Sequence, residues 1–523
     1  MFVRVKPSGP RKYLQIVENY RENGRVRQRV IATLGRMDEL ADSGEVDGLM
    51  KSLSRFAQRV RVVEGVAFGR LQAQGVLRIG PALVLERLWD RCGIREVVDR
   101  LLRERGFEFP VERGVFLSVL HRLFDPGSDR QAERWKADHR IEGAAELELH
   151  HLYRTMRWLG ENRQRIEEGL FAQRRTLFSE GQMIFFDTTS VYFEGQGGQT
   201  LGEYGLSKDH RPDRPQMVVG AVVDEAGCPI CAPMWAGNQA DVTTLPGVVD
   251  DLQRRFGIRQ FVIVADRGMI RRETLEAFEA QRPVQRYILG ARMRRQKEVK
   301  ERVLGRAGRY QEVAGNLHVK EVRVGDRRYI VCRNPEEAIR DAAAREAILE
   351  SLQEKLQHEP RALIGNRGYQ RFLSVRRGAV VLNDAKIEAD ARYDGKYVLR
   401  TNTELPAEEV ARRYKELWRV ERLFRDTKSL LDTRPIFHHF DATILGHVFV
   451  SFLALRVRHE MDQALGARGP QAEWADLCRD LEAIQEVEVQ DGQERYWLRT
   501  PLRGAAPAVF RALGMAIPPA FRQ

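Results

Sequence analysis

The chain has 523 residues, of which 43% are hydrophobic and 31% are charged. This length and composition are typical of a folded protein with several domains and exclude an intrinsically disordered one. Lysine and arginine number 86 against 74 aspartates and glutamates, and the resulting net charge of +12 favours a polyanionic partner, nucleic acid or an anionic membrane surface, over an arginine-rich proteome without such a partner.

Hydrophobic periodicity changes between the first two segments of the chain. Residues 1–70 begin with alternating apolar and polar residues around the turn-like sequence ENGR, which predicts a basic β-hairpin region. In residues 71–178 apolar residues recur every three or four positions. This spacing predicts a compact helical domain.

Residues 179–291 contain apolar runs of strand length. The runs MIFFDTTS, QMVVGAVVDEAGCPICAPMWAGN and QFVIVADRG are rich in Val, Ile and Phe, as are core strands of a sheet covered on both faces. The second run is expected to form a hairpin that turns at DEAG. A helix at RRETLEAFEAQR and a strand at RYILGAR complete the prediction of an α/β sheet.

The second half of the chain changes pattern twice. In residues 292–405 we expect a mostly β insertion domain, with strands in NLHVKEVRVGDRRYIVCR and AVVLNDAKIEADARYDGKYVLRTN and one helix in PEEAIRDAAAREAILESLQEKLQ. Helical spacing returns in residues 406–465, where Pro406 suits the first turn of a helix. Residues 466–523 form a C-terminal region with an expected role in dimerisation.

Cysteine usage and hydropathy suggest a location. The five cysteines are mostly isolated, which favours a reducing cytoplasm over a disulfide framework. Cys228 and Cys231 form a CxxC motif without a second ligand pair, so incidental thiols in a hairpin are preferred to a zinc site. The run ILGHVFVSFLALRV is shorter than the roughly 20 residues of a membrane span, and no signal-peptide core is present. We expect a cytoplasmic protein without a membrane segment.

Two aspartates directly follow apolar runs, Asp187 after MIFF and Asp266 after FVIVA. Ligands and reactive groups in α/β sheets collect at strand ends. Both aspartates are therefore candidate catalytic residues, with ordinary turn or helix-capping aspartates as the alternative.

A third carboxylate, Glu421, lies among basic residues in YKELWRVERLFRDTK, residues 414–428. On one ideal helix a single stripe contains Glu421 together with Tyr414, Leu417, Arg425 and Lys428. A neighbouring apolar stripe that would dock the helix on the sheet consists of Val420, Phe424 and Leu431. Glu421 is expected at the edge of the buried face, the alternative being a solvated pair with Arg425 at i+4.

Three converging carboxylates repel one another unless cations lie between them. Oxygen ligands favour Mg²⁺ or Mn²⁺, and two such ions roughly 3.5 to 4 Å apart can activate a water or a 3′-hydroxyl for displacement at phosphorus. We therefore expect Asp187, Asp266 and Glu421 to be metal ligands, with Arg425 and Lys428 holding phosphates beside the scissile bond.

At these residues the chain resembles the DDE transposases of bacterial insertion sequences. FFDTTS and VADRGM match the family's two aspartate motifs, and Tyr414, Glu421 and Lys428 match the Tyr-Arg-Glu-Lys signature, in which Leu417 replaces the arginine. The resemblance implies an α/β fold with a ribonuclease H-like catalytic core, a mixed five-stranded sheet flanked by helices. The core would consist of residues 179–291 and 406–465, and a β-rich insertion before the catalytic glutamate would separate these two parts. β-hairpin and helical regions would precede the core.

The resemblance also implies roles for single residues. Asp187 would bridge two Mg²⁺ or Mn²⁺ ions, with Asp266 and Glu421 each holding one. The residues expected to contact DNA are Tyr414, Arg419, Arg425, Lys428, Lys208, His210 and Arg211. Trp418 and Trp235 could stack on a base, although core packing is preferred for both, and His438 and His439 are not counted as ligands.

The function implied by the resemblance is that of a transposase. It would bind the terminal inverted repeats of its element as a homodimer, with residues 71–178 as a DNA-binding domain, nick the DNA, and join the 3′-hydroxyls to target DNA in the bacterial cytoplasm, associated with the nucleoid when bound to DNA. The alternatives are a non-catalytic DNA-binding repressor derived from a transposase and a metal-dependent nuclease on the same fold.

Overall fold

The computed structural model divides the chain into two compact units. It describes residues 1–22, 25–43, 45–54, 72–174, 182–269, 271–281, 284–358, 369, 371–376, 379–466, 472–491 and 494–522. One unit comprises Met1–Gly80, Ala472–Phe510 and Ala516–Gln523, and the other comprises Pro81–Gln471 and Arg511–Met515.

The first unit begins with a three-stranded antiparallel sheet in the order β1-β2-β3. Its strands are β1 (Phe2–Ser8), β2 (Arg11–Glu22) and β3 (Arg25–Arg36), and the helices α1 (Met37–Ser43) and α2 (Glu45–Ser54) follow. The predicted hairpin around ENGR is confirmed as the β2–β3 pair, to which β1 adds a strand.

A second sheet of the first unit joins distant parts of the sequence. Strand β4 (Gln72–Arg78) pairs with β17 (Gln485–Asp491), which pairs with β18 (Glu494–Arg499) and through it with β19 (Phe521–Arg522). The C-terminal helices are α16 (Trp474–Glu482) and α17 (Ala506–Ala512). Residues 75–78, expected to be helical, are therefore a strand, because their backbone hydrogen-bonds to a strand that no local pattern reveals.

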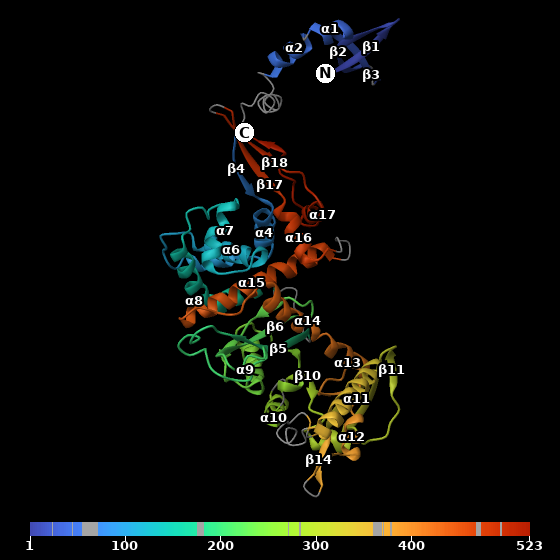
Figure 1. Cartoon of the computed structure of the whole chain (residues 1–523). Helices are drawn as coiled ribbons and strands as arrows, with labels where there is room; N and C mark the ends of the chain where they lie inside the picture. Colours follow the sequence, from blue (N-terminus) through green and yellow to red (C-terminus); the bar gives the residue numbers. More distant parts are fainter. Residues whose placement is uncertain are drawn as a thin grey trace. The chain divides into compact units, whose positions relative to one another are not determined.

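Helices form the predicted compact domain at the start of the second unit. They are α4 (Gly80–Arg91), α5 (Ile94–Leu102), α6 (Val111–Phe124), α7 (Asp129–Trp135) and α8 (Leu149–Arg174), and α15 (Asp441–Leu465) packs along α8 (Figure 1). Glycines allow the close crossing, since a Cβ at Gly160 or Gly446 would clash with a carbonyl oxygen of the other helix. The apolar run ILGHVFVSFLALRV is confirmed as buried helix within α15. Among the described residues, no helix has the length and apolarity needed to cross a membrane.

The large sheet of the second unit contains the ribonuclease H-like order β10-β9-β5-β6, with β7 and β8 both paired to β6. Its strands are β5 (Gln182–Tyr192), β6 (Gln216–Val223), β7 (Pro229–Cys231), β8 (Met234–Ala236), β9 (Phe261–Ala265) and β10 (Arg286–Ala291). Strands β5, β9 and β10 are parallel, while β6 runs antiparallel to β5 and turns at Asp224–Gly227 as predicted.

Helices cover both faces of this sheet, as the continuous apolar runs predict. On β5, Ile184 and Phe186 face a core that includes residues of α9 (Asp241–Arg254) and α10 (Arg272–Ala280). Met183 and Phe185 face the opposite core, which contains residues of the segment that carries Glu421. The strict alternation of the two cores follows from the twofold repeat of a strand.

The insertion extends the same sheet beyond β10 in the order β16-β13-β12-β11. Its elements are the π-helical η4 (Val299–Val303), β11 (Gln311–Ala314), β12 (Leu317–Val324), β13 (Arg327–Arg333), α11 (Pro335–His358), β14 (Leu373–Arg376), β15 (Ala379–Leu382), α12 (Asp384–Ala391) and β16 (Lys396–Thr401). The strands expected over residues 379–402 are interrupted by α12. Asn383 explains the helix, because its side chain caps it by accepting a hydrogen bond of 3.1 Å from the Lys386 N–H.

The segment that carries Glu421 is not the single helix expected from its spacing. Helix α13 (Ala407–Lys415) ends at a tight turn, α14 (Trp418–Arg425) follows, and Asp426–Leu430 forms a π-helical turn, η6. At the turn, the Leu417 N–H donates to the Tyr414 carbonyl, an i→i−3 bond of 3.1 Å. The turn lets Leu417 enter the core, where it is 5% exposed, so Leu417 and Glu421 do not share one stripe. The apolar stripe of Val420, Phe424 and Leu431 is confirmed as buried.

Candidate active site

Asp187 and Asp266 lie side by side at the edge of the sheet. Phe186 of β5 pairs with Ala265 of β9 in parallel register, and each aspartate is the next residue in its chain. The parallel pairing of β5 and β9 therefore brings together two acids that are far apart in sequence. Asp266 directly follows β9, as predicted, whereas Asp187 lies within β5, which continues to Tyr192.

The Asp187 carboxylate lies in a largely buried and negatively charged environment. Its Oδ1 accepts a hydrogen bond of 2.7 Å from the Thr188 N–H. Burial raises the pKa of Asp187 to about 6, and the charges of Asp266 and Asp241 act in the same direction, while Lys208 and the Thr188 N–H oppose them. Such a site gains from a bound cation, because the cation relieves the repulsion between the carboxylates.

Asp241 is a third acid at this edge, and sequence reasoning missed it. It is the first residue of α9; its Oδ1 accepts from the Thr188 hydroxyl at 2.7 Å and its Oδ2 pairs with Lys208 Nζ at 3.1 Å. The one sequence signal was the segment GNQADVTTL, in which an acid precedes a helix. Lys208, expected to contact DNA, is held inside the site by these contacts.

Tyr414, on α13, links the segment that carries Glu421 to Asp266. Its hydroxyl donates to Asp266 Oδ1 at 2.8 Å, and its ring stacks on Tyr397 at 5.8 Å between centroids. Burial and the neighbouring Asp266 raise the pKa of Tyr414, so the phenol stays protonated and remains a donor. Gly290 of β10 makes room for it, since a Cβ there would lie 2.5 Å from the Tyr414 hydroxyl.

Lys428 is also engaged within the protein. Its ammonium pairs with Asp209 Oδ1 at 2.6 Å, and Arg434 Nη1 reaches the same oxygen at 2.8 Å. The Asp209 side chain is 3% exposed and that of Lys428 is 14% exposed. The segment that contains Lys208 and Asp209 thus contacts β5 through Thr188 and the end of the Glu421-carrying segment through Lys428.

Glu421 is the predicted ligand that the structure does not gather with the aspartates. It lies on α14, is exposed, and makes no side-chain hydrogen bond or ion pair with any described residue. Over the described part of the chain, no group of three His, Cys, Asp or Glu side chains is placed to hold a metal ion. Like charges gain nothing from approaching each other without a cation between them.

The remaining predicted DNA contacts differ in their availability. Arg425 is exposed and has no side-chain partner among the described residues. Arg419 donates to the Glu225 carbonyl, and Arg211 pairs with Asp213 at 2.9 Å while lying over the Tyr192 ring. His210 is exposed and has a φ of 57°. Arg425 is therefore the most readily available cation of the set for a phosphate.

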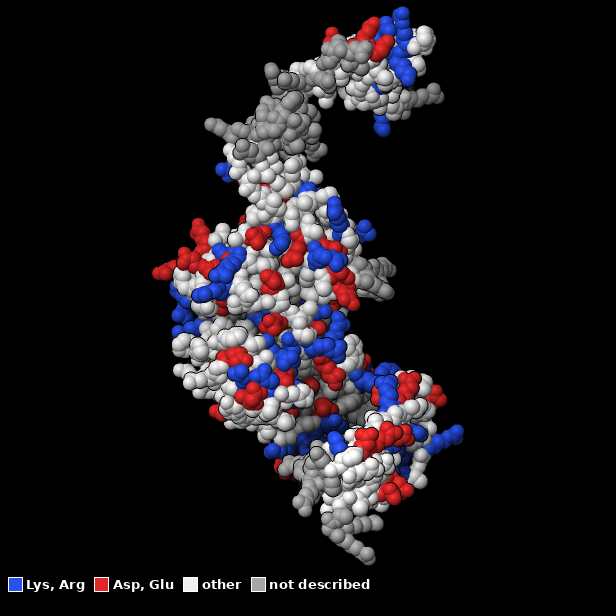
Figure 2. Space-filling model, viewed as in Figure 1, with Lys and Arg blue, Asp and Glu red and all other residues white. Residues whose placement is uncertain are grey.

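Asp266 also lines a hollow of about 380 Å³, together with four arginines that were not predicted from the sequence. They are Arg267, Arg292, Arg294 and Arg295. Arg292 is fixed by hydrogen bonds of 3.0 Å to the carbonyls of Arg267 and Gly268. On the face shown in Figure 2, by contrast, basic and acidic side chains are interspersed over the elements of the second unit. The cations next to Asp266 gather from two strand ends, which sequence order does not reveal.

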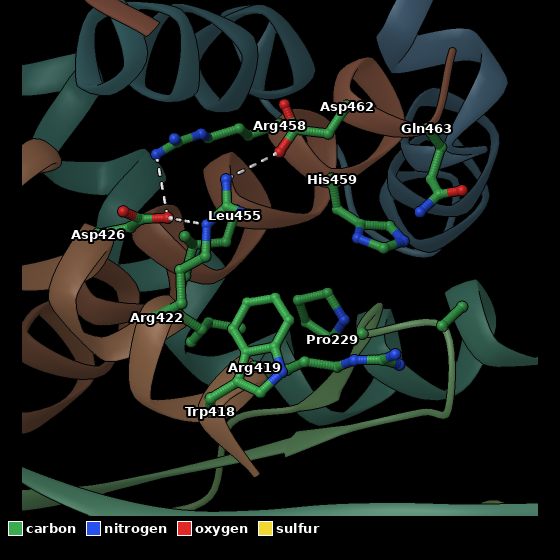
Figure 3. A pocket seen from close by; sticks show the side chains of 13 residues that line it. Pro229, Trp418, Arg419, Arg422, Asp426, Leu455, Arg458, His459, Asp462 and Gln463 are labelled. Atoms are coloured by element: carbon green, nitrogen blue, oxygen red, sulfur yellow. Dashed lines mark ion pairs between the residues drawn. The ribbon is translucent and has the colours of Figure 1, made fainter. Parts of the chain in front are cut away.

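A second hollow, of about 270 Å³, is lined by residues of α14, α15 and the segment 226–229 (Figure 3). Trp418, 50% exposed, lines it together with Pro229 and His459. Three arginines and two aspartates line it. Asp426 pairs with Arg458 at 3.1 Å, Arg422 reaches Asp462 at 3.6 Å, and Arg419 donates to the Glu225 carbonyl. The expected core packing is wrong for Trp418, whereas Trp235 packs against the core as expected.

The CxxC motif and the histidine pair lie in buried surroundings. Cys228 and Cys231 are buried, and burial raises the pKa of both thiols. Burial likewise lowers the pKa of His438 to about 4, so that its imidazole is neutral beside the His447 ring.

Two family models match parts of the chain. A family model described as "Transposase DDE domain" matches residues 179–455, and one described as "IS1634 family transposase, N-terminal domain" matches residues 3–66. Among solved structures, the piggyBac transposase synaptic complex with hairpin DNA matches 77% of this chain and 79% of that chain, with 10% identity and a TM-score of 0.38. No curated protein sequence matches the chain.

Proposed function

The chain belongs to the DDE transposases, since the family model spans more than half of it, and we propose that Asp187, Asp266 and Glu421 are the catalytic triad of this transposase. As a member of the family it is a DNA-binding enzyme of polynucleotidyl transfer that depends on divalent metal. The triad's residues, the identity and number of the ions, and the DNA sites are the parts that we propose.

One observation carries the proposal: Asp187 in β5 lies next to Asp266, which follows the parallel strand β9, and Tyr414 of α13 hydrogen-bonds to Asp266. The donor set fits Mg²⁺ or Mn²⁺, because carboxylate oxygens are hard ligands. Burial, together with the charges of Asp266 and Asp241, raises the pKa of Asp187, and a bound cation would relieve the repulsion between these carboxylates. Asp187, Asp266 and Glu421 would hold the ions, of which we propose two. When bound, the ions supply Lewis-acid activation of the attacking oxygen and stabilisation of the leaving one.

The chain's own residues orient this chemistry. The Tyr414 hydroxyl fixes Asp266 Oδ1, so Oδ2 remains available as a ligand. Glu421 has no competing partner among the described residues, and it lies on α14, which a turn at Glu416 and Leu417 separates from α13. Arg292 and its neighbours beside Asp266 provide positive charge for the phosphates of a strand placed across the site.

We propose that the substrate is the terminal inverted repeat of an insertion sequence, and that the protein acts as a homodimer in the cytoplasm. The match of residues 3–66 to a transposase N-terminal domain supports a role for the first unit in DNA recognition. The expected products are nicks at the repeat ends, followed by joining of the 3′-hydroxyls to target DNA.

The test is cleavage by Asp187→Ala and Glu421→Gln. Both variants are expected to lose strand cleavage and strand transfer on DNA that carries the repeats, by a factor of at least about 10³ since each removes a ligand of the reacting metal, while they retain repeat binding in a gel-shift assay. Glu408→Gln is the matched control, because Glu408 is an exposed carboxylate that pairs with Arg412 on α13. Normal cleavage by either triad variant would contradict the assignment.

A further inference from the structure

Lys208 occupies an unusual position for a basic residue in an exposed loop. Its ammonium donates to the Thr188 carbonyl and hydroxyl, each at 2.7 Å, and pairs with Asp241 Oδ2 at 3.1 Å. Thr188 is the residue after Asp187, and its N–H binds Asp187 Oδ1. The side chain thus reaches inward to the catalytic strand, where it has three oxygen partners.

Asp241 is placed to hold that cation between the two catalytic aspartates. Its Oδ1 accepts from the Thr188 hydroxyl, beside Asp187. Its Oδ2 would lie 3.7 Å from a Cβ at Gly268, which is two residues beyond Asp266. The Lys208 and Asp241 side chains are 31% and 24% exposed, so the pair is partly shielded from solvent.

An ordinary surface ion pair would explain the Lys208–Asp241 contact alone, and such pairs contribute little. It does not explain why the same ammonium is saturated by two further bonds to Thr188. A lysine that serves DNA phosphates needs its ammonium free. The ammonium of Lys208 is instead bonded to protein oxygens, next to carboxylates whose mutual repulsion it reduces.

We propose that Lys208 is the resident cation of the catalytic carboxylates and that Asp241 holds it there, so that the pair sets the affinity of the site for divalent metal. The inference rests on the proposed metal site at Asp187 and Asp266. Both are positioning residues, since neither is assigned a contact with the substrate.

The proposal makes opposite predictions for the two members of the pair. Lys208→Gln removes a positive charge that opposes a divalent cation, so Mn²⁺ should bind more tightly. Asp241→Asn keeps an oxygen for the Thr188 hydroxyl but removes a negative charge and the anchor of Lys208, so Mn²⁺ should bind more weakly. Each change is expected to be about tenfold, the size of a single charge interaction at a partly buried site.

The experiment is calorimetric titration of Mn²⁺ into the full chain without DNA. Lys208→Arg keeps the charge and should retain the wild-type affinity, and Lys415→Gln, an exposed lysine on α13, controls for net charge and should change it less than about twofold. Thermal unfolding of each variant without metal checks that it is folded. Equal affinities for wild type and Lys208→Gln would overturn the inference.

A second measurement separates this inference from the sequence-based role of Lys208 and from the proposed site itself. If Lys208 contacts phosphate, Lys208→Gln lowers the salt dependence of DNA binding by about 0.9 in log–log slope and leaves Mn²⁺ affinity unchanged, which contradicts the inference. Loss of Mn²⁺ binding in Asp187→Ala with no effect of Lys208→Gln refutes the inference alone. Mn²⁺ binding that survives Asp187→Ala refutes the proposed site and the inference together.

Discussion

At the residue scale, one oxygen of Asp209 receives two cations. Lys428 and Arg434 both approach its Oδ1, while Oδ2 is buried without a hydrogen-bond partner among the described residues. The Lys428 side chain is 14% exposed, and its burial lowers the pKa of the ammonium. The lysine of the family signature therefore anchors the end of the third segment to the segment before β6.

Asp209→Asn is expected to destabilise the second unit by about 3 kcal/mol, because a nearly buried carboxylate would be replaced by a neutral amide beside two cations. Chemical denaturation measures the change. Asp213→Asn in the same segment is the matched control: its carboxylate is 58% exposed, and the cost should be about 0.5 kcal/mol or less. Equal costs for the two variants would show that Asp209 is not an anchor.

At the scale of elements, the position of α13 on the sheet depends on a missing side chain. Gly290 lies in β10 with the Tyr414 hydroxyl and the Arg267 backbone N within 2.5 and 2.9 Å of where its Cβ would be. Strand β10 also pairs with β9 on one side and β16 on the other. The close approach of α13 to β10 is what allows Tyr414 to reach Asp266.

Gly290→Ala should separate Tyr414 from Asp266 and cost about 1 to 3 kcal/mol, as overpacking of a filled site does. Cleavage should fall by a larger factor than DNA binding, since the orientation of Asp266 is lost while the basic surface remains. Denaturation and a cleavage assay measure the two effects. Gly315→Ala, which has no neighbour within 4 Å of its Cβ, should alter neither; unchanged cleavage in Gly290→Ala would argue against an orienting role for Tyr414.

At the scale of the whole molecule, the net charge of +12 does not give the number of lysine and arginine side chains that are available to contact DNA phosphates. Lys428, Lys208 and Arg419 are held by protein oxygens, whereas Arg425 is exposed without a side-chain partner among the described residues. The charge that neutralises phosphates is therefore a subset selected by the fold.

DNA binding measured against salt concentration tests this selection. Arg425→Gln should reduce the log–log slope by about 0.9, the contribution of one phosphate contact. Lys428→Gln should leave the slope unchanged, because its ammonium is already paired with Asp209. A reduced slope in the Lys428 variant would instead assign that lysine to the DNA, as the signature alone suggests.

The sequence by itself determined the class of fold and predicted two aspartates that the sheet brings together. Apolar runs of strand length that end in an acid, Asp187 and Asp266, predicted both the sheet and the position of the aspartates on its edge. Both signals are local, because the apolar run and the acid that follows it occupy consecutive positions in the sequence. The apolar stripe of Val420, Phe424 and Leu431 was predictable for the same reason.

Only the tertiary structure decided which charges meet. The sequence placed Tyr414, Glu421 and Lys428 on one helical stripe, but a turn at Leu417 divides that helix, and Tyr414 on α13 hydrogen-bonds to Asp266. Asp241, Asp209 and Gly290 carry no distinguishing local pattern, and their partners lie far away in the chain. Helical periodicity describes a continuous helix, whereas an ion pair is fixed by packing that brings distant segments together.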